Sequence, residues 1–235
     1  MEDMERYGDY NEVDEAPKSK VRTVGFWLKI LVILCCFCVV AFLGFRIYLF
    51  NYYPEQIEDI YISDNIKAYY EKNGSVKPLT QTLRAPYDDP DNASFFCDNL
   101  YVIRECGELQ VSVRFNTSAI EYIEKELGLD GLSPDDSELL IFRLYKNGET
   151  DSYERVVGRL CEVITDSKLM YRYYKLVFDG IDFGEDKDKI EWIRLEIFVK
   201  GQDGQAPFAM IPIYENNDGY SSFKELELSE EDILK

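Results

Sequence analysis

The hydrophobic residues of this chain follow two different patterns, and the first is a long apolar run near the N-terminus. Residues 26–47 are almost all apolar, and positions 30–45 contain no charged or strongly polar side chain. A helix needs about 20 apolar residues to cross a hydrocarbon layer of ~30 Å. Trp27 lies at one end of the run and Tyr48 at the other, like the aromatic belts at the two faces of a bilayer. The pattern predicts a transmembrane helix over residues 25–50.

A cleaved signal peptide also contains an apolar run, so the flanking residues decide between the two. A signal peptide starts with a short basic segment and ends at an A-x-A-like cleavage site. This chain starts with a long acidic segment, and no such site follows the run. The basic residues near the N-terminal side of the run outnumber those at its other end, Lys18, Lys20, Arg22 and Lys29 against Arg46. By the positive-inside rule, we expect an uncleaved single-pass anchor of type II topology in the cell membrane, with the N-terminus in the cytoplasm and the C-terminal domain outside.

The second pattern is an alternation of apolar and polar residues that begins at about Phe95. In segment 109–115 the odd positions are apolar and the even positions are polar, and segment 193–199 alternates in a similar way. A period of two is typical of a β-strand with one face on a core and the other on water. The further strand candidates are 94–104, 138–146, 155–164, 169–178, 207–214 and 223–228.

Turn residues and helix caps separate the strand candidates. The turn sequences are 105–108, 146–149, 165–168 and 202–205. Ser63 or Asp64 provides an N-cap for a helix over residues 65–72. Thr117 provides an N-cap for a second helix, over residues 118–127. Both helices are short, and neither is part of a repeating strand–helix–strand pattern.

Together these elements predict the fold class and the organisation of the chain. Pro212 lies inside the strand candidate 207–214 and predicts an edge strand or a bulge there. Short strands with tight turns are typical of an antiparallel sandwich. We predict a mainly-β, antiparallel, sandwich-like extracytoplasmic domain with one or two short helices over residues 93–235. Residues 51–92 are predicted to form a stalk with a short helix, and residues 1–24 a disordered acidic cytoplasmic tail.

Charge and composition narrow the range of functions. The chain has 26 Lys and Arg against 45 Asp and Glu, a formal net charge of -19, of which residues 51–235 carry -18. Nucleic-acid binding depends on clustered basic residues, so we expect no nucleic-acid partner. The chain contains no His. This excludes Ser-His-Asp and Cys-His catalysis, zinc sites built on His, and haem with an axial His.

The best candidate for a metal site is an acidic loop. Asp88, Asp89, Asp91 and Asn92 lie within five residues and offer the oxygen ligands that Ca²⁺ prefers. The loop lacks the ordered D-x-D-x-D-G pattern of a dedicated calcium loop, and an acidic chain forms such clusters by chance. A weak calcium site and a solvated loop are therefore both open interpretations, and we expect no other cofactor.

Three cysteines lie in the predicted outer part of the chain, at Cys97, Cys106 and Cys161. In an oxidising compartment they allow one disulfide and one free thiol. Their spacing does not select the pair. A buried position for all three is the alternative.

Tyrosines gather on one strand candidate, at Tyr171, Tyr173 and Tyr174, and on the first predicted helix, at Tyr69 and Tyr70. Exposed tyrosines bind peptides or glycans through flat, amphipathic rings. Tyr also fills half-buried positions of sheets, for which it has a high propensity. This propensity favours the buried interpretation for the strand.

These features favour a non-enzymatic binding or assembly module of the cell envelope, anchored in the lipid bilayer and facing an envelope protein or a glycan. A small carboxylate-dependent envelope hydrolase is the alternative, because such an enzyme needs two acids and no His. A single-pass sensor is a second alternative, although the short tail offers no folded domain to receive a signal. A deep cleft with two converging carboxylates favours the hydrolase, and a shallow aromatic or acidic face favours the binding module.

Overall fold

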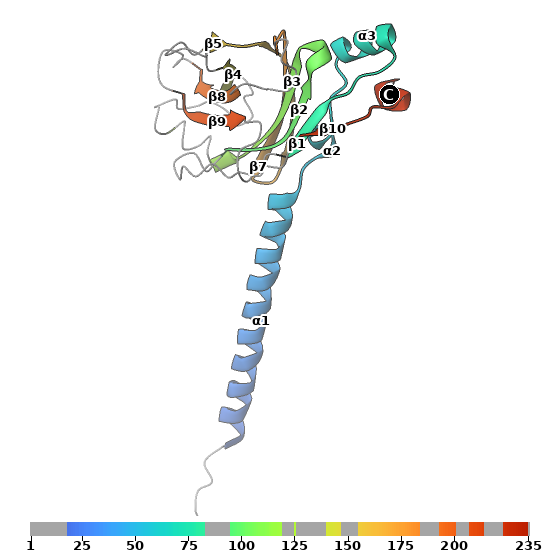
Figure 1. Cartoon of the computed structure of the whole chain (residues 1–235). Helices are drawn as coiled ribbons and strands as arrows, with labels where there is room; N and C mark the ends of the chain where they lie inside the picture. The colour runs from blue at the N-terminus through green and yellow to red at the C-terminus, as the bar shows by residue number, and fades with distance from the viewer. Residues whose placement is uncertain are drawn as a thin grey trace, which may run out of the picture. The chain divides into compact units, whose positions relative to one another are not determined.

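The computed structural model describes residues 18–82, 95–118, 125, 140–146, 155–183, 193–200, 207–213 and 223–234 (Figure 1). The chain divides into two compact units, Met1–Tyr52 and Tyr53–Lys235. The first unit contains a long helix, and the second, which we call the β domain, contains the strands.

The long helix is α1 (Lys18–Asn51). Its segment Val24–Leu49 has a mean hydropathy of 2.8 and is long and apolar enough to cross a membrane. The side chains of residues 24–48 are all exposed. This confirms an apolar N-terminal helix, but α1 begins before the predicted interval 25–50. The helix continues into the polar residues that precede the apolar run, because Lys and Arg are good helix formers and these residues include no Pro.

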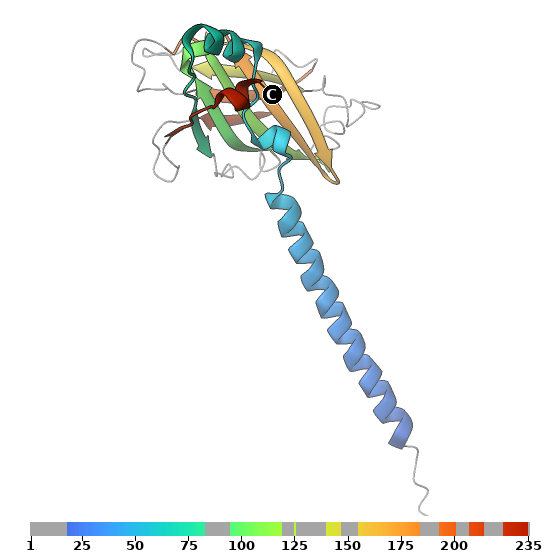
Figure 2. The ribbon, with the colours of Figure 1, turned by 90° about the vertical axis from the view of Figure 1, so that its right-hand side faces the viewer.

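The β domain contains two sheets (Figure 2). The larger sheet has six strands in the order β10-β1-β2-β3-β7-β6, and the smaller has four in the order β5-β4-β8-β9. All neighbouring strands are antiparallel, which confirms the prediction of a mainly antiparallel β domain. In chain order the strands are β1 (Leu79–Thr82), β2 (Phe95–Ile103), β3 (Glu108–Asn116), β4 (Leu140–Lys146), β5 (Arg155–Val156), β6 (Arg159–Lys168), β7 (Tyr171–Asp179), β8 (Ile193–Val199), β9 (Ala209–Ile213) and β10 (Lys224–Glu225).

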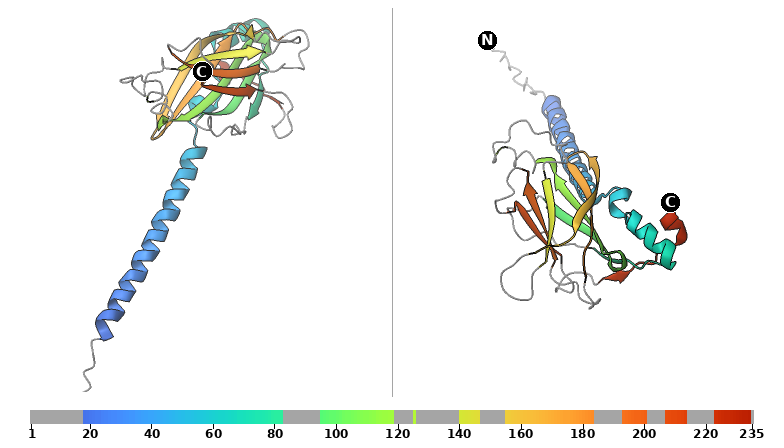
Figure 3. Two further views of the ribbon diagram at one scale, coloured as in Figure 1. Left: turned by 90° about the vertical axis from the view of Figure 1, so that its left-hand side faces the viewer. Right: turned by 90° about the horizontal axis from the view of Figure 1, so that it is seen from above.

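The two sheets lie face to face (Figure 3). They share one hydrophobic core, to which each contributes apolar side chains. Val111 of β3, Leu176 of β7 and Leu195 of β8 are fully buried in it. Aromatic rings connect the sheets, since the centroid of Phe142 on β4 lies 5.8 Å from that of Tyr174 on β7. The alternation that predicted these strands therefore identifies their core-facing residues correctly.

The predicted strand 155–164 is two strands that belong to different sheets. β5 pairs with β4 in the smaller sheet, and β6 pairs with β7 in the larger one. The chain changes sheet at Gly158, whose φ of 69° is in the left-handed region. A Cβ at this position would lie 2.9 Å from the carbonyl oxygen of Asp179. The apolar residues continue through the break, so their pattern does not reveal it.

The hairpin between β6 and β7 turns later than predicted. The polar run 165–168 was expected to form the turn, but it extends β6, and Lys168 pairs with Tyr171. The turn falls on Leu169 and Met170. β6 is an edge strand of the larger sheet with mostly exposed or half-buried side chains, so a polar run is compatible with a strand there.

A third layer covers the outer face of the larger sheet. Its helices are α2 (Glu55–Glu58), α3 (Asp64–Asn73) and α5 (Glu230–Leu234). Figure 3 shows this layer on the side of the larger sheet that faces away from the smaller sheet. A second hydrophobic cluster, which includes Ile66, Val76 and Ile103, lies between the layer and the sheet. Residues 51–92 were predicted as a stalk, but their described part from Tyr53 onward packs onto the β domain.

α3 confirms the predicted helix over residues 65–72. Ser63 is its N-cap, because the Ser63 hydroxyl accepts a hydrogen bond from the backbone N–H of Ile66 at 3.2 Å. Gly74, with a φ of 74°, ends the helix in the left-handed conformation.

Other predicted elements are described only in part. Of the helix predicted over residues 118–127, residues 118 and 125 are helical and the rest lies outside the described residues. Most of the turn sequence 146–149 and all of 202–205 also lie outside them. β9, which contains Pro212, is an edge strand of the smaller sheet, as predicted.

The turn between β2 and β3 provides a test of this packing. Gly107 and Gly74 both have positive φ, so replacing either by Ala introduces the same backbone strain of about 1 kcal/mol. A Cβ at Gly107 would also lie 2.8 Å from the carbonyl oxygen of Ile181, whereas nothing lies within 4 Å at Gly74. We expect Gly107→Ala to lower the free energy of unfolding by roughly 2–4 kcal/mol and Gly74→Ala by about 1 kcal/mol. Denaturant titration of the full chain in detergent measures both, and equal losses contradict the packing described here.

Candidate functional site

The outer face of β3 carries a row of polar side chains. Glu108, Gln110, Ser112 and Arg114 alternate with the core residues of this strand, as predicted, but all four are buried. The expectation that this face meets water is wrong, because residues 53–66 lie across it. We call this segment the strap.

The strap runs antiparallel to β3 and makes hydrogen bonds with successive members of the polar row. The side-chain amide of Gln110 donates to the carbonyl of Tyr61 at 2.6 Å and accepts from the N–H of Tyr61 at 2.8 Å. The hydroxyl of Ser112 donates to the carbonyl of Ile57 at 2.6 Å. Most of these bonds involve the backbone of the strap. The larger sheet therefore binds the strap mainly through the backbone of the strap.

The carbonyls of Glu58 and Asp59 are the most heavily bonded part of the strap. The carbonyl of Glu58 accepts from the Tyr101 hydroxyl at 2.8 Å, from the Asn99 amide at 3.3 Å and from the ammonium of Lys175 at 3.5 Å. Lys175 also donates to the carbonyl of Asp59. These donors come from β2 and β7, the strands on either side of β3. The strap is therefore held across three strands.

Burial changes the ionisation of Lys175. Desolvation lowers the pKa of its ammonium to about 7, against the opposing effect of the nearby acidic groups of Asp59 and Glu58. Its Nζ lies 4.8 Å from the ring centroid of Tyr101, and Ser112 and Ile164 are its partners on the adjacent strands. Near neutral pH, this buried amine is therefore close to the midpoint of its own titration.

Glu108 is a second ionisable group beneath the strap. Burial raises the pKa of its carboxyl, hydrogen bonds from Ser63 and Gln110 oppose this shift, and the charge of Asp179 adds to it. Ser63 donates to one carboxyl oxygen at 2.6 Å and Gln110 donates to the other at 2.7 Å. Both oxygens of Glu108 are thus bound within the protein.

Arg114 lies at the end of the polar row, among aromatic rings. Its guanidinium carbon is 5.1 Å from the ring centroids of Tyr53 and Phe96 and 5.4 Å from that of Tyr171. The ring of Tyr53 also meets Tyr173 edge to face, with centroids 5.3 Å apart. Burial raises the pKa of the Tyr53 hydroxyl. These contacts between a cation and aromatic faces hold the first residue of the strap.

The tyrosines of β7 divide between the two faces of the larger sheet. Tyr173 faces the strap, whereas Tyr174 faces the core, where its ring centroid is 5.0 Å from that of Phe115. Tyr171 is buried as well, so the interpretation of these three residues as sheet-filling is correct. Tyr69 on α3 differs, because it is only half-buried and lines two neighbouring pockets. We call the two pockets together the Tyr69 groove.

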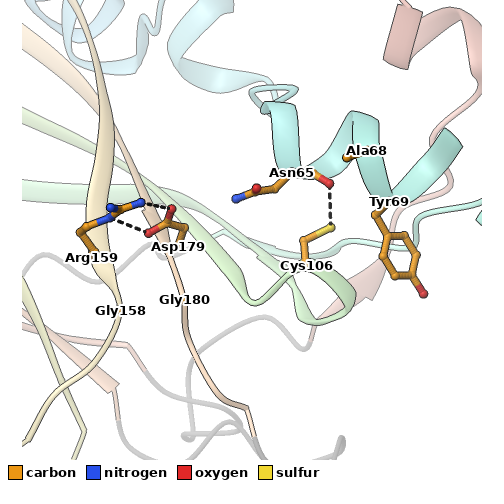
Figure 4. Close-up of a pocket in the computed structure, with 8 residues that line it drawn as sticks. All are labelled: Asn65, Ala68, Tyr69, Cys106, Gly158, Arg159, Asp179 and Gly180. Atoms are coloured by element: carbon orange, nitrogen blue, oxygen red, sulfur yellow. Dashed lines mark hydrogen bonds and ion pairs between the residues drawn. The ribbon is translucent and has the colours of Figure 1, made fainter. Parts of the chain in front are cut away.

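The first pocket of the groove is shallow and has a volume of about 620 Å³. Its lining residues are Asn65, Ala68, Tyr69, Cys106, Gly158, Arg159, Asp179 and Gly180. Figure 4 shows Arg159 and Asp179 on one wall and the residues of α3 with Cys106 on the other. Arg159 donates two hydrogen bonds to the carboxylate of Asp179, at 3.2 and 2.8 Å. The guanidinium is largely exposed, so this pair adds little stability and is accessible to a ligand.

The second pocket has a volume of about 590 Å³ and mixes charged, aromatic and aliphatic groups. Its lining residues are Tyr69, Lys77, Leu79, Arg104, Glu105, Gly107, Ile181, Asp182, Phe183 and Glu225. Lys77 donates to Glu225 at 2.7 Å. Such a surface carries both signs of charge next to apolar rings, which is typical of protein interfaces.

The cysteines do not form a reactive centre. Cys106 lines the first pocket, but burial raises the pKa of its thiol to about 12, so it stays protonated at neutral pH. Cys97 is buried in β2, Cys161 is exposed on β6, and all three thiols are free. The structure therefore contains none of the disulfides that the sequence allows among them.

The predicted calcium ligands are not tested by the structure. Asp88, Asp89, Asp91 and Asn92 fall in the interval 83–94, outside the described residues. Within the described ranges, no group of three or more His, Cys, Asp or Glu side chains is placed to hold a metal ion. A calcium site at these four residues stays a prediction.

The alternative of a carboxylate-dependent hydrolase also stays a prediction. Glu108 has a raised pKa, as a general acid requires, but it lies beneath the strap and lines neither pocket. Glu105, Asp182 and Glu225 line the second pocket, where Glu225 is paired with Lys77.

Sequence patterns did not identify the Tyr69 groove or Lys175. The groove combines α3, the 3₁₀ turn Arg104–Cys106, strands β1, β6 and β10, and the end of β7, so no local motif marks it. The sequence does contain an indication of Lys175, because this residue is the single cation within the run Tyr173–Phe178, which is otherwise aromatic and aliphatic. A charge in such a run indicates either an edge position or a specific buried partner.

Comparison with known proteins assigns no family to this chain. No protein-family model matches it, and neither a curated protein nor a solved structure does. The function is therefore argued from the geometry of the site itself.

Lys175 predicts how stability depends on pH. Between the folded pKa near 7 and the ordinary value of 10.5, the unfolded chain binds a proton that the folded chain does not. The free energy of unfolding should therefore rise with pH, by up to about 1.4 kcal/mol per pH unit. We expect Lys175→Met to flatten this rise. Chemical denaturation of the full chain between pH ~7 and ~8.5, below the ordinary pKa of Tyr and near that of Cys, measures the slope.

Lys77→Met is the matched control. Glu225 raises the pKa of the exposed Lys77, so Lys77 is charged in both the folded and the unfolded chain across this window. Replacing Lys77 by Met should therefore change the free energy of unfolding by the same amount at each pH. The same slope in Lys175→Met as in the unmodified chain contradicts the assignment of the pH dependence to Lys175.

Proposed function

We propose that this chain is a single-pass membrane protein whose β domain acts outside the cytoplasm as a non-enzymatic binding module of the cell envelope. The observation that carries the proposal is α1. Its 26-residue segment Val24–Leu49 spans about 39 Å as a helix, more than the ~30 Å of a hydrocarbon layer. The side chains of residues 24–48 are exposed, and a bilayer is the solvent in which such a surface is stable.

The junction between α1 and the β domain favours an anchor over a cleaved signal peptide. Signal-peptide cleavage takes place at small residues just after the apolar segment. Here the helix continues to Asn51, and Tyr53 already packs against Tyr173 and Arg114. The residues at this junction, 48–53, include no small side chain of the kind that the cleavage site requires. The basic residues that precede the apolar run support a cytoplasmic N-terminus.

The Tyr69 groove is the surface that supports a binding role. Its first pocket is open and shallow, and the groove combines the half-buried ring of Tyr69 with exposed charged groups such as Arg159 and Lys77. Aromatic and Arg side chains are enriched where proteins bind one another. We therefore favour a segment of an envelope protein as the ligand. The anchor raises the effective concentration of the domain for partners at the same membrane.

The topology predicts which end of the chain is accessible from outside. With one epitope tag before Met1 and another after Lys235, antibodies should bind the C-terminal tag on intact cells or spheroplasts. The N-terminal tag should be bound only after the membrane is permeabilised. Binding of the N-terminal tag on intact cells, or release of a soluble domain that lacks α1, contradicts the proposed topology.

The groove predicts where a partner contacts the domain. A photo-crosslinking phenylalanine analogue in place of Tyr69 should form adducts of defined mass in native membranes. The same analogue in place of Met210, an exposed residue of β9 in the other sheet, is the matched control and should form none. Adducts that are identical at both positions, or found only at Met210, contradict the groove as the binding surface.

A further inference from the structure

Leu169, at the tip of the β6–β7 hairpin, combines an unusual backbone conformation with an exposed side chain. Its φ of 54° lies in the left-handed region, which Gly, Asn and Asp adopt readily and which disfavours Leu. The residue is also 65% exposed. Among the described residues of the β domain, Met210 is the one other large hydrophobic residue whose side chain is exposed. An exposed apolar side chain in a strained turn does not stabilise the domain, which points to a contact made beyond it.

The hairpin tip lies at the end of the larger sheet where the chain enters the β domain. Tyr171, directly after the tip, contacts the guanidinium of Arg114, which also contacts Tyr53. The ring of Tyr173 meets that of Tyr53 as well, and Figure 2 shows the tip at the end of the sheet near α2. Only Tyr52 separates Tyr53 from the last residue of α1. Two residues of chain span at most about 7 Å, so the link between α1 and Tyr53 is short.

The residues around Leu169 have the chemistry of a bilayer interface. Lys168 precedes it, and Met170 and Arg172 follow it on either side of the buried Tyr171. The side chains of Lys168, Met170 and Arg172 are half-buried. In membrane proteins, apolar side chains enter the acyl region, and Lys and Arg extend toward the phosphates. This short basic and apolar run occurs in a part of the chain that carries a net charge of -18.

The acidic group nearest the tip in sequence is bound within the domain. Asp166 accepts a hydrogen bond from the side chain of Gln56 at 3.0 Å and another from the N–H of Ser167 at 2.6 Å. Its carboxylate is therefore held by α2 and by its own strand. The carbonyl of Met170 accepts from the N–H of Thr117 at 2.8 Å, which fixes the base of the turn. The tip is thus a well-supported turn with an apolar residue at its end.

We propose that the β6–β7 hairpin tip, centred on Leu169, inserts into the headgroup layer of the bilayer that α1 crosses. The inference rests on the proposed membrane anchoring and adds a second, independent attachment point. A helix alone leaves the domain free to rotate about the linking residues. Insertion of Leu169 fixes one end of the larger sheet on the membrane, and the orientation of the Tyr69 groove relative to the bilayer is then fixed as well.

Fluorescence quenching by brominated lipids tests this contact. The chain has two Trp, at positions 27 and 192. In a background of Trp27→Phe and Trp192→Phe, Leu169→Trp provides a reporter at the tip, with Met170→Trp as a second one. Met210→Trp is the matched exposed control. The full chain is reconstituted in phosphatidylcholine vesicles that are brominated at a shallow acyl position, and its emission is compared with that in unbrominated vesicles.

We expect strong quenching and a blue-shifted emission for the tip reporters and neither for Met210→Trp. A separate variant that keeps Trp27 and carries only Trp192→Phe reports on the helix. Quenched Trp27 together with unquenched tip reporters overturns the hairpin contact and leaves the anchor intact. Unquenched Trp27 overturns the membrane anchor itself. Circular dichroism checks that each reporter variant folds, and two tip positions guard against a single misfolded variant.

Discussion

The buried polar face of the larger sheet is the constraint on which the β domain depends. A buried donor or acceptor without a partner destabilises a protein by about 1–3 kcal/mol. The strap supplies partners for Glu108, Gln110, Ser112 and Lys175: Ser63 donates to Glu108, and the other three bind backbone carbonyls of the strap. Without the strap, the buried polar groups of the sheet would lack these hydrogen-bond partners, and the strap would lack them without the sheet. The residues that directly follow α1 are therefore part of the domain rather than a spacer before it.

Sequence patterns predicted this architecture where one face of a strand meets the core. The alternation in β3 and β8 identified the inner residues because water and a hydrocarbon core select opposite side chains. The alternation did not predict that the outer face of β3 is buried. A polar side chain at such a position is compatible with hydrogen bonds to water and with hydrogen bonds to the strap, so the sequence does not distinguish the two. The alternation also missed the change of sheet at Gly158, which depends on a close approach to Asp179 between strands. The late turn at Leu169 was missed because this position lacks the usual turn residues.

The candidate site was less predictable than the fold. Tyr69 attracted attention as one of several tyrosines, but its partners in the groove are distant in the sequence. Lys77 meets Glu225 only because β10 pairs with β1, and Arg159 meets Asp179 only because β6 pairs with β7. Local motifs reveal a site when its ligands lie on one loop, as in the acidic loop proposed for calcium. A surface assembled from several elements has no such signature, and the fold must be known first.

The direction of the strap along β3 determines how the molecule responds to mechanical load. Tension transmitted through α1 reaches Tyr53 and its contact with Arg114 before the bonds at Ile57, Tyr61 and Ser63. Along the chain, these contacts therefore take up a load before it reaches the strands that follow. If all of them detach, the eleven residues 53–63 extend to about 36 Å at ~3.3 Å per residue and lengthen the link between α1 and the sheets.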